Sequence, residues 1–134
     1  MRVVALGGGH GLAASLSALR RLETDLTGVV TVADMRFLPN PFWIDELRPL
    51  TGLDEAVRDY VRKQPRSEEF LDRYEGLVAL LTDGFLHEDK HFLTIAIGCT
   101  GGRHRSVAMA EAFAERLRAH DVRTLVVHRD LGRE

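Results

Sequence analysis

Residues 92–106 read FLTIAIGCTGGRHRS, an apolar and β-branched run that passes directly into a loop rich in glycine and arginine. The run Phe92–Ile97 predicts a buried strand. Ala108–His120 then has the pattern of a helix, and Thr124–His128 that of another strand. A strand, a helix and a strand in this order predict a βαβ unit with parallel strands.

The N-terminal residues predict a second βαβ unit. The short apolar run Arg2–Leu6 ends in a glycine-rich turn, the segment Leu12–Leu22 has helical apolar spacing, and Gly28–Ala33 is β-branched. The two units together predict an α/β fold with a mainly parallel sheet of about four strands and flanking helices. The 134 residues, 45% of them apolar, predict a single domain over residues 1–134.

Between the two units, the sequence predicts a loop and two helices. Two prolines in residues 34–43 exclude a central strand there, so an ordered loop is expected. Thr51 and Asp54 resemble a capping box for a helix that continues to about Lys63. Ser67 is predicted to cap a second helix that continues to about Leu81.

Composition excludes several classes of protein. No run of eighteen apolar residues could span a bilayer, and the N-terminus lacks a signal-peptide pattern, so a soluble cytoplasmic protein is expected. Cys99 is the single cysteine, which precludes an internal disulfide and a C-x-x-C zinc pair. His87 and His91 are interpreted as parts of a solvated turn. Neither a metal nor a cofactor is expected.

The net charge of -2 conceals an asymmetry along the chain. Residues 44–90 hold seven Lys or Arg against twelve Asp or Glu, whereas residues 103–133 hold seven Arg against four Asp or Glu. The C-terminal third could therefore attract anions. Solvation of a helix face by the same arginines is an equally good interpretation.

The loop after the strand at 92–97 is the strongest candidate site. Ligands of parallel α/β sheets bind beyond the carboxyl ends of strands, where a loop turns into a helix. Glycines permit close backbone approach, and a helix N-terminus with arginines and hydroxyls favours a phosphate. A helix cap made by Ser106 is the simpler alternative. The predicted ligand-binding residues are Thr100, Gly101, Gly102, Arg103, His104, Arg105 and Ser106.

The same loop matches the Cys-x5-Arg signature of cysteine-dependent phosphatases, with Cys99 as nucleophile and Arg105 as phosphate clamp. A buried, purely apolar role for Cys99 is favoured over this chemistry. The acids available for a leaving group are Asp34, Asp83 and Asp130. In the preceding loop, Arg36, Asn40 and Trp43 could line a pocket, although Asn40 is better explained as a turn residue and Trp43 as core or interface.

Several longer motifs carry a family resemblance. DMRFLPNPFW at 34–43, LRPLTGLDEAVRDYV at 47–61, LTIAIGCTGGRHRSV at 93–107 and HRDL at 128–131 occur in this order. From about Asp34 to Arg133 the chain resembles the C-terminal domain of the RapZ (YvcJ) family, known as RNase adapter proteins.

The resemblance implies an adapter that binds a small regulatory RNA, presents it to an endoribonuclease and senses glucosamine-6-phosphate in the control of amino-sugar synthesis. Thr100, Gly101, Gly102, His104 and Arg105 match the family's ligand loop. A homo-oligomer is left open. No Walker A motif G-x-x-x-x-G-K-[ST] occurs, so bound ATP or GTP is not expected. The candidate RNA contacts are Arg103, Arg123, His128, Arg129 and Arg133.

The first 33 residues resemble a different family. VVALGGGHGLAASLSALRRL at 3–22 and VVTVAD at 29–34 look like the start of the CofD-like YvcK family, which binds phosphorylated ligands such as nucleotide sugars. This resemblance makes the chain a splice of two families near Asp34. It also makes Gly7, Gly8, Gly9 and Gly11 a second phosphate loop, for which a tight turn is an equally good explanation.

Overall fold

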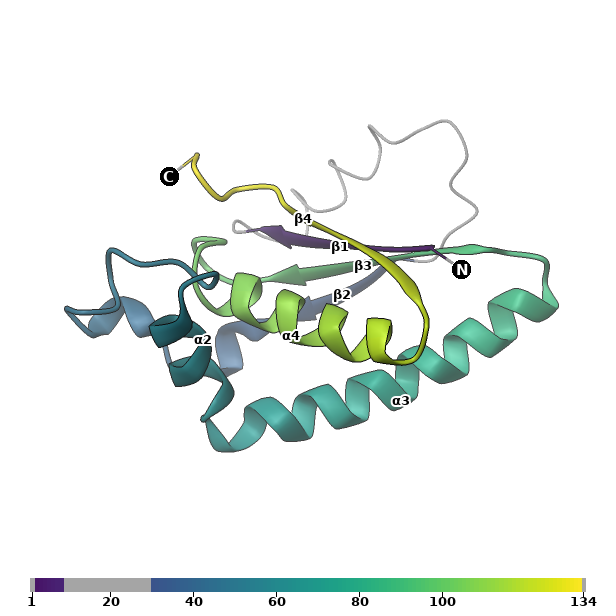
Figure 1. Ribbon diagram of the computed structural model, residues 1–134, viewed down its shortest axis with the longest axis horizontal. Helices are drawn as coiled ribbons and strands as arrows, with labels where there is room; N and C mark the ends of the chain where they lie inside the picture. Colours follow the sequence, from purple (N-terminus) through teal and green to yellow (C-terminus); the bar gives the residue numbers. More distant parts are fainter. Residues whose placement is uncertain (1, 9–29, 134) are drawn as a thin grey trace.

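The computed structural model describes residues 2–8 and 30–133 of the chain (Figure 1). Two 3-10 helices, η1 and η2, follow the second strand. The elements in chain order are β1 (Arg2–Gly8), β2 (Val30–Asp34), η1 (Met35–Phe37), η2 (Pro41–Trp43), α2 (Glu55–Arg62), α3 (Pro65–His87), β3 (Phe92–Gly98), α4 (Arg105–Ala119) and β4 (Arg123–His128). No helix in these two ranges is long and apolar enough to cross a membrane.

The strands are arranged in the order β2-β3-β1-β4, and each neighbouring pair is parallel. The predicted α/β class and the parallel pairing are thereby confirmed. Within each predicted βαβ unit, however, the two strands are not neighbours: β3 lies between β1 and β2, and β1 lies between β3 and β4. The helix predicted at Leu12–Leu22 lies outside the described residues.

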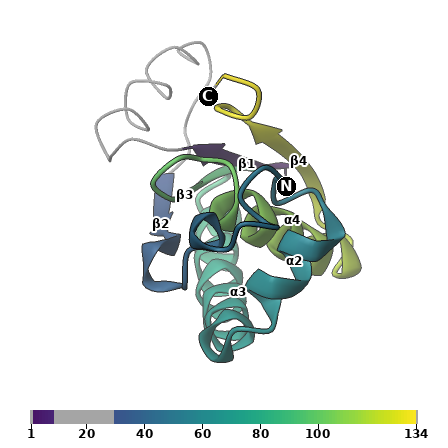
Figure 2. The same cartoon turned by 90° about the vertical axis from the view of Figure 1, so that its left-hand side faces the viewer.

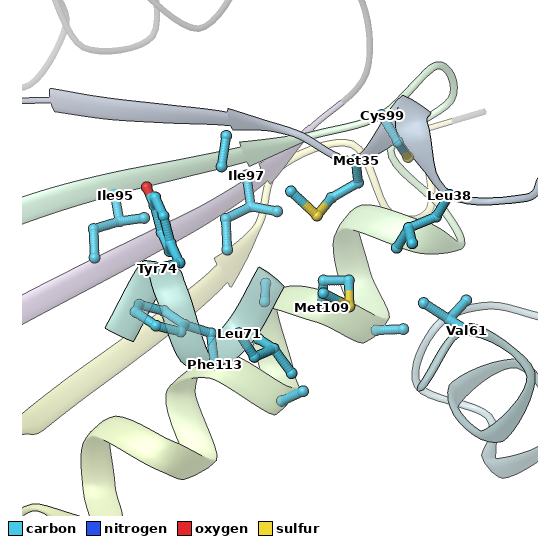
Figure 3. Packing of buried hydrophobic residues seen from close by; sticks show 14 of the residues in the cluster. Met35, Leu38, Val61, Leu71, Tyr74, Ile95, Ile97, Cys99, Met109 and Phe113 are labelled. Atoms are coloured by element: carbon cyan, nitrogen blue, oxygen red, sulfur yellow. The ribbon is translucent and has the colours of Figure 1, made fainter. Parts of the chain in front are cut away.

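The three α-helices of the described residues lie on the same side of the sheet (Figure 2). α4 is the central one, since it contacts β1, β3, β4, α2 and α3. Its small and apolar side chains, such as Ala108 and Ala110, are completely buried and allow this close packing. Figure 3 shows the apolar core converging from three elements: Ile95 and Ile97 from β3, Leu71 and Tyr74 from α3, and Met109 and Phe113 from α4.

The helix boundaries differ from the predicted ones. α2 begins at Glu55, because Thr51 and Asp54 form a separate turn in which the Asp54 carboxylate accepts from the Thr51 N–H at 2.7 Å. The prediction that Ser67 caps α3 is wrong. Pro65 occupies the first turn, where no N–H is needed, and the buried Ser67 hydroxyl donates instead to the Val61 carbonyl at 2.5 Å.

Both α3 and α4 are longer than predicted. α3 continues to His87, beyond the expected end at Leu81, and α4 begins at Arg105, three positions before Ala108. α3 and α4 are joined by the Arg116 guanidinium, which donates to Glu68 at 2.6 Å and to Glu75 at 3.0 Å. Hydrogen bonds to the carboxylates of Asp72, Glu75 and Glu68 raise the pKa of Arg116 further above its ordinary value.

The loop predicted at residues 34–43 is ordered, as expected, and its turns are capped by side chains. The Asp34 carboxylate accepts from the Arg36 N–H at 2.9 Å at the start of η1. The Asn40 side chain accepts from the Phe42 N–H at 3.2 Å at the start of η2. The turn-forming role predicted for Asn40 is therefore confirmed.

Candidate functional site

Parallel pairing brings two loops to one edge of the sheet. Asp34, the last residue of β2, is in register with Gly98, the last residue of β3. The loop after β2 and the loop after β3 therefore leave the sheet side by side, at its carboxyl edge (Figure 1). The second loop reaches α4 through Gly102, whose φ of 64° lies in the left-handed region that suits glycine.

Arg105 joins these two loops. Its side chain is only 5% exposed, and its Nη1 donates to the Leu38 carbonyl at 2.9 Å. Its Nη2 donates to the Thr100 hydroxyl at 3.4 Å, while Nε is buried with no hydrogen-bond partner among the described residues. Arg105, the predicted phosphate clamp, therefore holds the two loops together in this structure. Its Nε–H has no acceptor among the described residues.

Arg103 and His104 fasten a third segment, residues 48–52, to the same loop. Arg103 Nε donates to the Leu50 carbonyl at 2.9 Å, and its Nη2 donates to the carbonyl of Pro49. His104 Nε2 lies 3.3 Å from the Arg48 carbonyl. Burial lowers the pKa of His104 below its ordinary value of 6.5, which favours the neutral imidazole.

Gly52 permits this close approach. Its N–H donates to the Arg103 carbonyl at 2.8 Å. A Cβ at this position would overlap the His104 carbonyl oxygen and the Ala108 backbone nitrogen. Glycine is therefore required by space at position 52 rather than by a special φ.

These contacts enclose a pocket of about 570 Å³, a volume suited to a small organic ligand. We call it the basic pocket, because four arginines and one histidine line it against a single carboxylate. Its lining residues are Asn40, Phe42, Trp43, Arg48, Cys99, Thr100, Gly101, Arg103, His104, Arg105, Asp130 and Arg133.

Backbone donors are also available at the basic pocket. Among the described residues, no hydrogen bond satisfies the N–H groups of Thr100, Gly101 or Gly102. α4 begins at Arg105, three positions after Gly102, and no side chain caps its first turn. Free N–H groups in a loop that leads into a helix, together with the positive end of the helix dipole, favour an anion.

The sequence identified part of this site. Thr100, Gly101, Arg103, His104 and Arg105 line the basic pocket, whereas Gly102 and Ser106 do not. Asn40 and Trp43 line it as well, and Trp43 is 75% exposed rather than part of the core. Arg36 is instead paired with Asp34 at 2.6 Å, and this pair lowers the Asp34 pKa.

Sequence reasoning missed Phe42 and Arg48 as lining residues. The Arg48 guanidinium lies 5.2 Å from the Phe42 ring centroid, and Arg48 Nε donates to the Phe42 carbonyl at 2.8 Å. The signal available in the sequence was the basic Arg48 beside Pro49, placed shortly after the aromatic pair. Asp130 was considered only as an acid, but it too lines the basic pocket.

Cys99 lies on the wall of the basic pocket but is buried. Its Sγ lies 3.1 Å from the Ser106 Oγ, to which the thiol donates. Of the three acids considered for phosphatase chemistry, Asp130 lines the same pocket and Asp83 lies near the far end of α3. No group of three or more potential metal-ligating side chains occurs in residues 2–8 and 30–133.

The predicted RNA contacts do not form one surface. Arg103 and Arg133 line the basic pocket, and Arg129 is close by, paired with Asp130 at 2.8 Å. Arg123 is in register with Arg2, so it lies at the opposite, amino edge of the sheet. His128 is largely buried, with its Nε2 2.6 Å from the Glu111 carboxylate.

Comparison with known proteins gives consistent matches. The sequence profile described as the RapZ C-terminal domain matches residues 22–132. A nucleotide-binding protein of Streptomyces coelicolor is 60% identical over 103 residues, which cover 77% of this chain and 34% of that protein. One of Frankia alni is 58% identical over 113 residues, covering 84% of this chain and 37% of that protein.

A nucleotide-binding protein of Thermobifida fusca is 52% identical over 132 residues, covering 98% of this chain and 40% of that protein. The chain thus spans little more than a third of the length of these relatives. The profile match begins at residue 22, earlier than the predicted boundary at Asp34. The predicted likeness of residues 1–33 to the YvcK family is not shown by these comparisons. Of its glycine loop, only Gly7 and Gly8 lie within the described residues, at the end of β1.

Proposed function

This chain belongs to the RapZ C-terminal domain family, and we propose that its basic pocket binds a phosphorylated amino sugar, glucosamine-6-phosphate. In this role the domain is a sensor in a cytoplasmic RNA-binding adapter and performs no chemistry on the ligand. The nucleotide-binding proteins that the chain resembles are much longer than this chain.

The observation that carries the proposal is the charge and donor content of the basic pocket. Four arginines and a single aspartate line it, and the N–H groups of Thr100 and Gly101, a few positions before α4, have no hydrogen bond among the described residues. A phosphate is the small-molecule group that best satisfies such a concentration of donors. The remaining volume and the polar rim, with Asn40 and Asp130, accommodate the hydroxyl and ammonium groups of an amino sugar.

Thermal unfolding with added ligand tests this proposal. At about one hundred times its dissociation constant, a ligand stabilises a protein by roughly 2.7 kcal/mol. We expect glucosamine-6-phosphate to raise the unfolding midpoint, and glucosamine or inorganic phosphate at the same concentration to raise it much less. Equal shifts with all three compounds, or no shift, would contradict amino-sugar phosphate recognition.

A matched pair of arginine variants locates the site. Arg48 lines the basic pocket with a partly exposed side chain, so Arg48→Ala should abolish most of the ligand-induced shift and retain the fold. Arg66, in the first turn of α3, is exposed and is not a lining residue. Arg66→Ala is therefore expected to respond to ligand like the unaltered chain.

For RNA, we propose that phosphates are bound at the carboxyl edge of the sheet, by Arg103, Arg129 and Arg133. Such contacts carry little sequence information and weaken steeply with salt. In a gel-shift titration with a structured small RNA, Arg133→Ala should weaken binding and reduce its salt dependence. Arg123→Ala, at the other edge, should have no effect. Presentation of the bound RNA to an endoribonuclease belongs to the same proposal.

A second candidate function is a phosphatase that acts through Cys99 and Arg105. Two observations favour this function: the Cys99–Ser106 contact at 3.1 Å, and the position of Asp130 in the same pocket. Hydrolysis of an aryl phosphate that disappears in Cys99→Ser would support it. Ligand binding that survives in Cys99→Ser, without turnover in either protein, would support the sensor.

For the N-terminal segment, we propose that Gly7, Gly8, Gly9 and Gly11 form the second phosphate loop implied by the YvcK resemblance. A nucleotide sugar should then stabilise the chain independently of Arg48, and Gly9→Ala should remove that effect alone. If Arg48→Ala and Gly9→Ala remove the same response, the chain has one phosphate site.

A further inference from the structure

An exposed aromatic pair lines the basic pocket. Trp43 is 75% exposed, the highest value among the large apolar side chains that the structure describes, and Phe42 beside it is 45% exposed. Both side chains line the pocket together with its four arginines. The pocket therefore presents a flat apolar surface as well as a concentration of positive charge.

Local contacts hold the aromatic pair in place. The Phe42 and Trp43 ring centroids are 5.4 Å apart, and the two rings are nearly perpendicular, at 84°. The Arg48 guanidinium lies 5.2 Å from the Phe42 centroid and is paired with Asp45 at 2.7 Å. The Trp43 N–H donates to the Asn40 carbonyl at 3.2 Å, within the turn of η2. Because the pair is already ordered, a ligand that stacks on it pays little conformational entropy.

The two rings of the pair differ in what they leave open. Phe42 is contacted by the edge-to-face neighbour Trp43 and by the Arg48 guanidinium. For Trp43, the contact with Phe42 is the one ring contact among the described residues. Three quarters of the Trp43 surface remains exposed. The indole therefore offers a flat surface on which a planar ring can stack.

Donors for a phosphate lie in the same pocket. Arg105 is nine-tenths buried, and its Nε has no hydrogen-bond partner among the described residues. The backbone N–H groups of Thr100 and Gly101 also lack a partner there. A phosphate accepts from such donors, and a nucleobase stacks on exposed aromatic rings. A ligand that carries both groups uses the two parts of the pocket together, whereas a hexose phosphate has no planar ring to stack.

From this arrangement we propose that the basic pocket also binds a nucleoside monophosphate, with its base stacked on Trp43 and its phosphate at residues 100–105. The pocket of about 570 Å³ has room for the base and the ribose. The nucleotide is either free or the phosphorylated 5′ end of an RNA, because both present the same base, ribose and phosphate. The inference shares its phosphate-binding residues with the proposed function, but the contact with the base is separate from it.

Calorimetric titration of three compounds tests the proposal. Adenosine 5′-monophosphate should bind about tenfold more tightly than ribose 5-phosphate, because stacking of a base on an aromatic side chain has this magnitude. Adenosine, which lacks the phosphate, should bind more weakly than the monophosphate. Equal binding of the monophosphate and ribose 5-phosphate by the unaltered chain would overturn the proposal.

Variants of Trp43 locate the contact with the base. Trp43→Leu retains an apolar side chain without an aromatic face, and it should reduce the ratio of the two affinities to about one. Trp43→Tyr restores an aromatic ring and should recover most of the ratio. An unchanged ratio in Trp43→Leu would overturn the proposal.

Phe37→Leu is the matched control. Phe37 is an exposed aromatic residue of η1 that does not line the basic pocket. The ratio of the two affinities should be the same in Phe37→Leu as in the unaltered chain. An equal loss in Phe37→Leu and Trp43→Leu would assign the effect to general destabilisation and overturn the proposal. Circular dichroism verifies that each variant is folded.

Short RNA oligonucleotides distinguish the two sources of the nucleotide. The same unstructured sequence is compared with a 5′-phosphate and with a 5′-hydroxyl. A preference for the phosphorylated form that disappears in Trp43→Leu would identify the 5′ end of an RNA as the ligand. Equal binding of the two oligonucleotides, with adenosine 5′-monophosphate still preferred over ribose 5-phosphate, would identify a free nucleotide.

A titration with glucosamine-6-phosphate distinguishes this inference from the proposed function. If the chain binds glucosamine-6-phosphate and does not discriminate between adenosine 5′-monophosphate and ribose 5-phosphate, the inference alone is refuted. If the chain binds adenosine 5′-monophosphate through Trp43 and does not bind glucosamine-6-phosphate, the proposed function alone is refuted.

Discussion

Arg105 Nη1 donates a hydrogen bond to the Leu38 carbonyl at 2.9 Å, across 67 positions of sequence. This bond connects the first turn of α4 to the loop after β2, so the two walls of the basic pocket depend on one buried guanidinium. In the proposed function, the N–H groups of the loop can bind a phosphate only if both walls keep this separation.

The first prediction concerns Arg105. Arg105→Ala leaves the Leu38 carbonyl without its charged donor, and hydrogen bonds to charged groups contribute about 1.5–3 kcal/mol. We expect a loss of this size in urea unfolding, together with loss of ligand binding. Arg118→Ala is the control, because Arg118 is exposed and donates a single bond to the Thr124 carbonyl. Equal stability of the two variants would show that Arg105 does not stabilise the walls of the basic pocket.

The second prediction concerns Gly52. A methyl group at Gly52 overlaps backbone atoms of His104 and Ala108, which cannot rotate away as a side chain could. Overpacking of this kind costs about 1–3 kcal/mol, so Gly52→Ala should lower the free energy of unfolding by that amount. Gly84→Ala should change it in the opposite sense, by about 0.5–1 kcal/mol, because Gly84 is helical and open. Differential scanning calorimetry distinguishes the two signs.

The third prediction is acid sensitivity through His104. Burial lowers its pKa in the folded state below the ordinary 6.5, so the unfolded chain binds a proton more readily as the pH falls below 6.5. Stability should therefore decrease from pH 7 towards pH 5. His104→Gln should flatten this dependence. Asp34 and Asp54, whose pKa values lie below 3.8, contribute only in more acidic solution.

The fourth prediction concerns Tyr74. Its hydroxyl is buried without a hydrogen-bond partner among the described residues, and burial raises the pKa of Tyr74 to about 12. The folded state holds this proton more tightly than the unfolded state, so stability falls as the pH rises from 10 to 12. Tyr74→Phe removes that contribution.

At pH 7, Tyr74→Phe also removes an unsatisfied polar group, and we expect the free energy of unfolding to rise by about 1 kcal/mol. Guanidinium titrations of both proteins at pH 7 and between pH 10 and 12 measure the gain of stability and the pH dependence. A large loss of stability at pH 7 would show that the hydroxyl has a partner.

The fifth prediction uses Trp43, the single tryptophan of the chain, which lines the basic pocket. Because the side chain is exposed, a ligand in the pocket should shift its fluorescence and protect it from acrylamide. The change should saturate with the dissociation constant obtained from thermal unfolding. Ligand binding without any fluorescence response would place the ligand away from Trp43.

The local pattern of the sequence was sufficient for the strands and for several residues of the loop after β3 that line the basic pocket. The run at 92–97 has the pattern of a buried strand and forms most of β3, and GCTGGRHRS after it has the glycines and donors expected of an anion loop. Helix ends were less predictable. Serine is a common N-cap residue, but α3 begins two positions before Ser67, at Pro65. The Ser67 hydroxyl instead donates to the Val61 carbonyl.

The sequence by itself determined the α/β class, the parallel strands and the family, because these depend on periodicity and residue chemistry within short segments. Only the tertiary structure decided that Arg48 and Phe42 complete the basic pocket, that Arg105 is buried against Leu38, and that Arg123 lies apart from the other arginines. These relations depend on strand order and register, which place distant segments side by side through packing that no local pattern encodes.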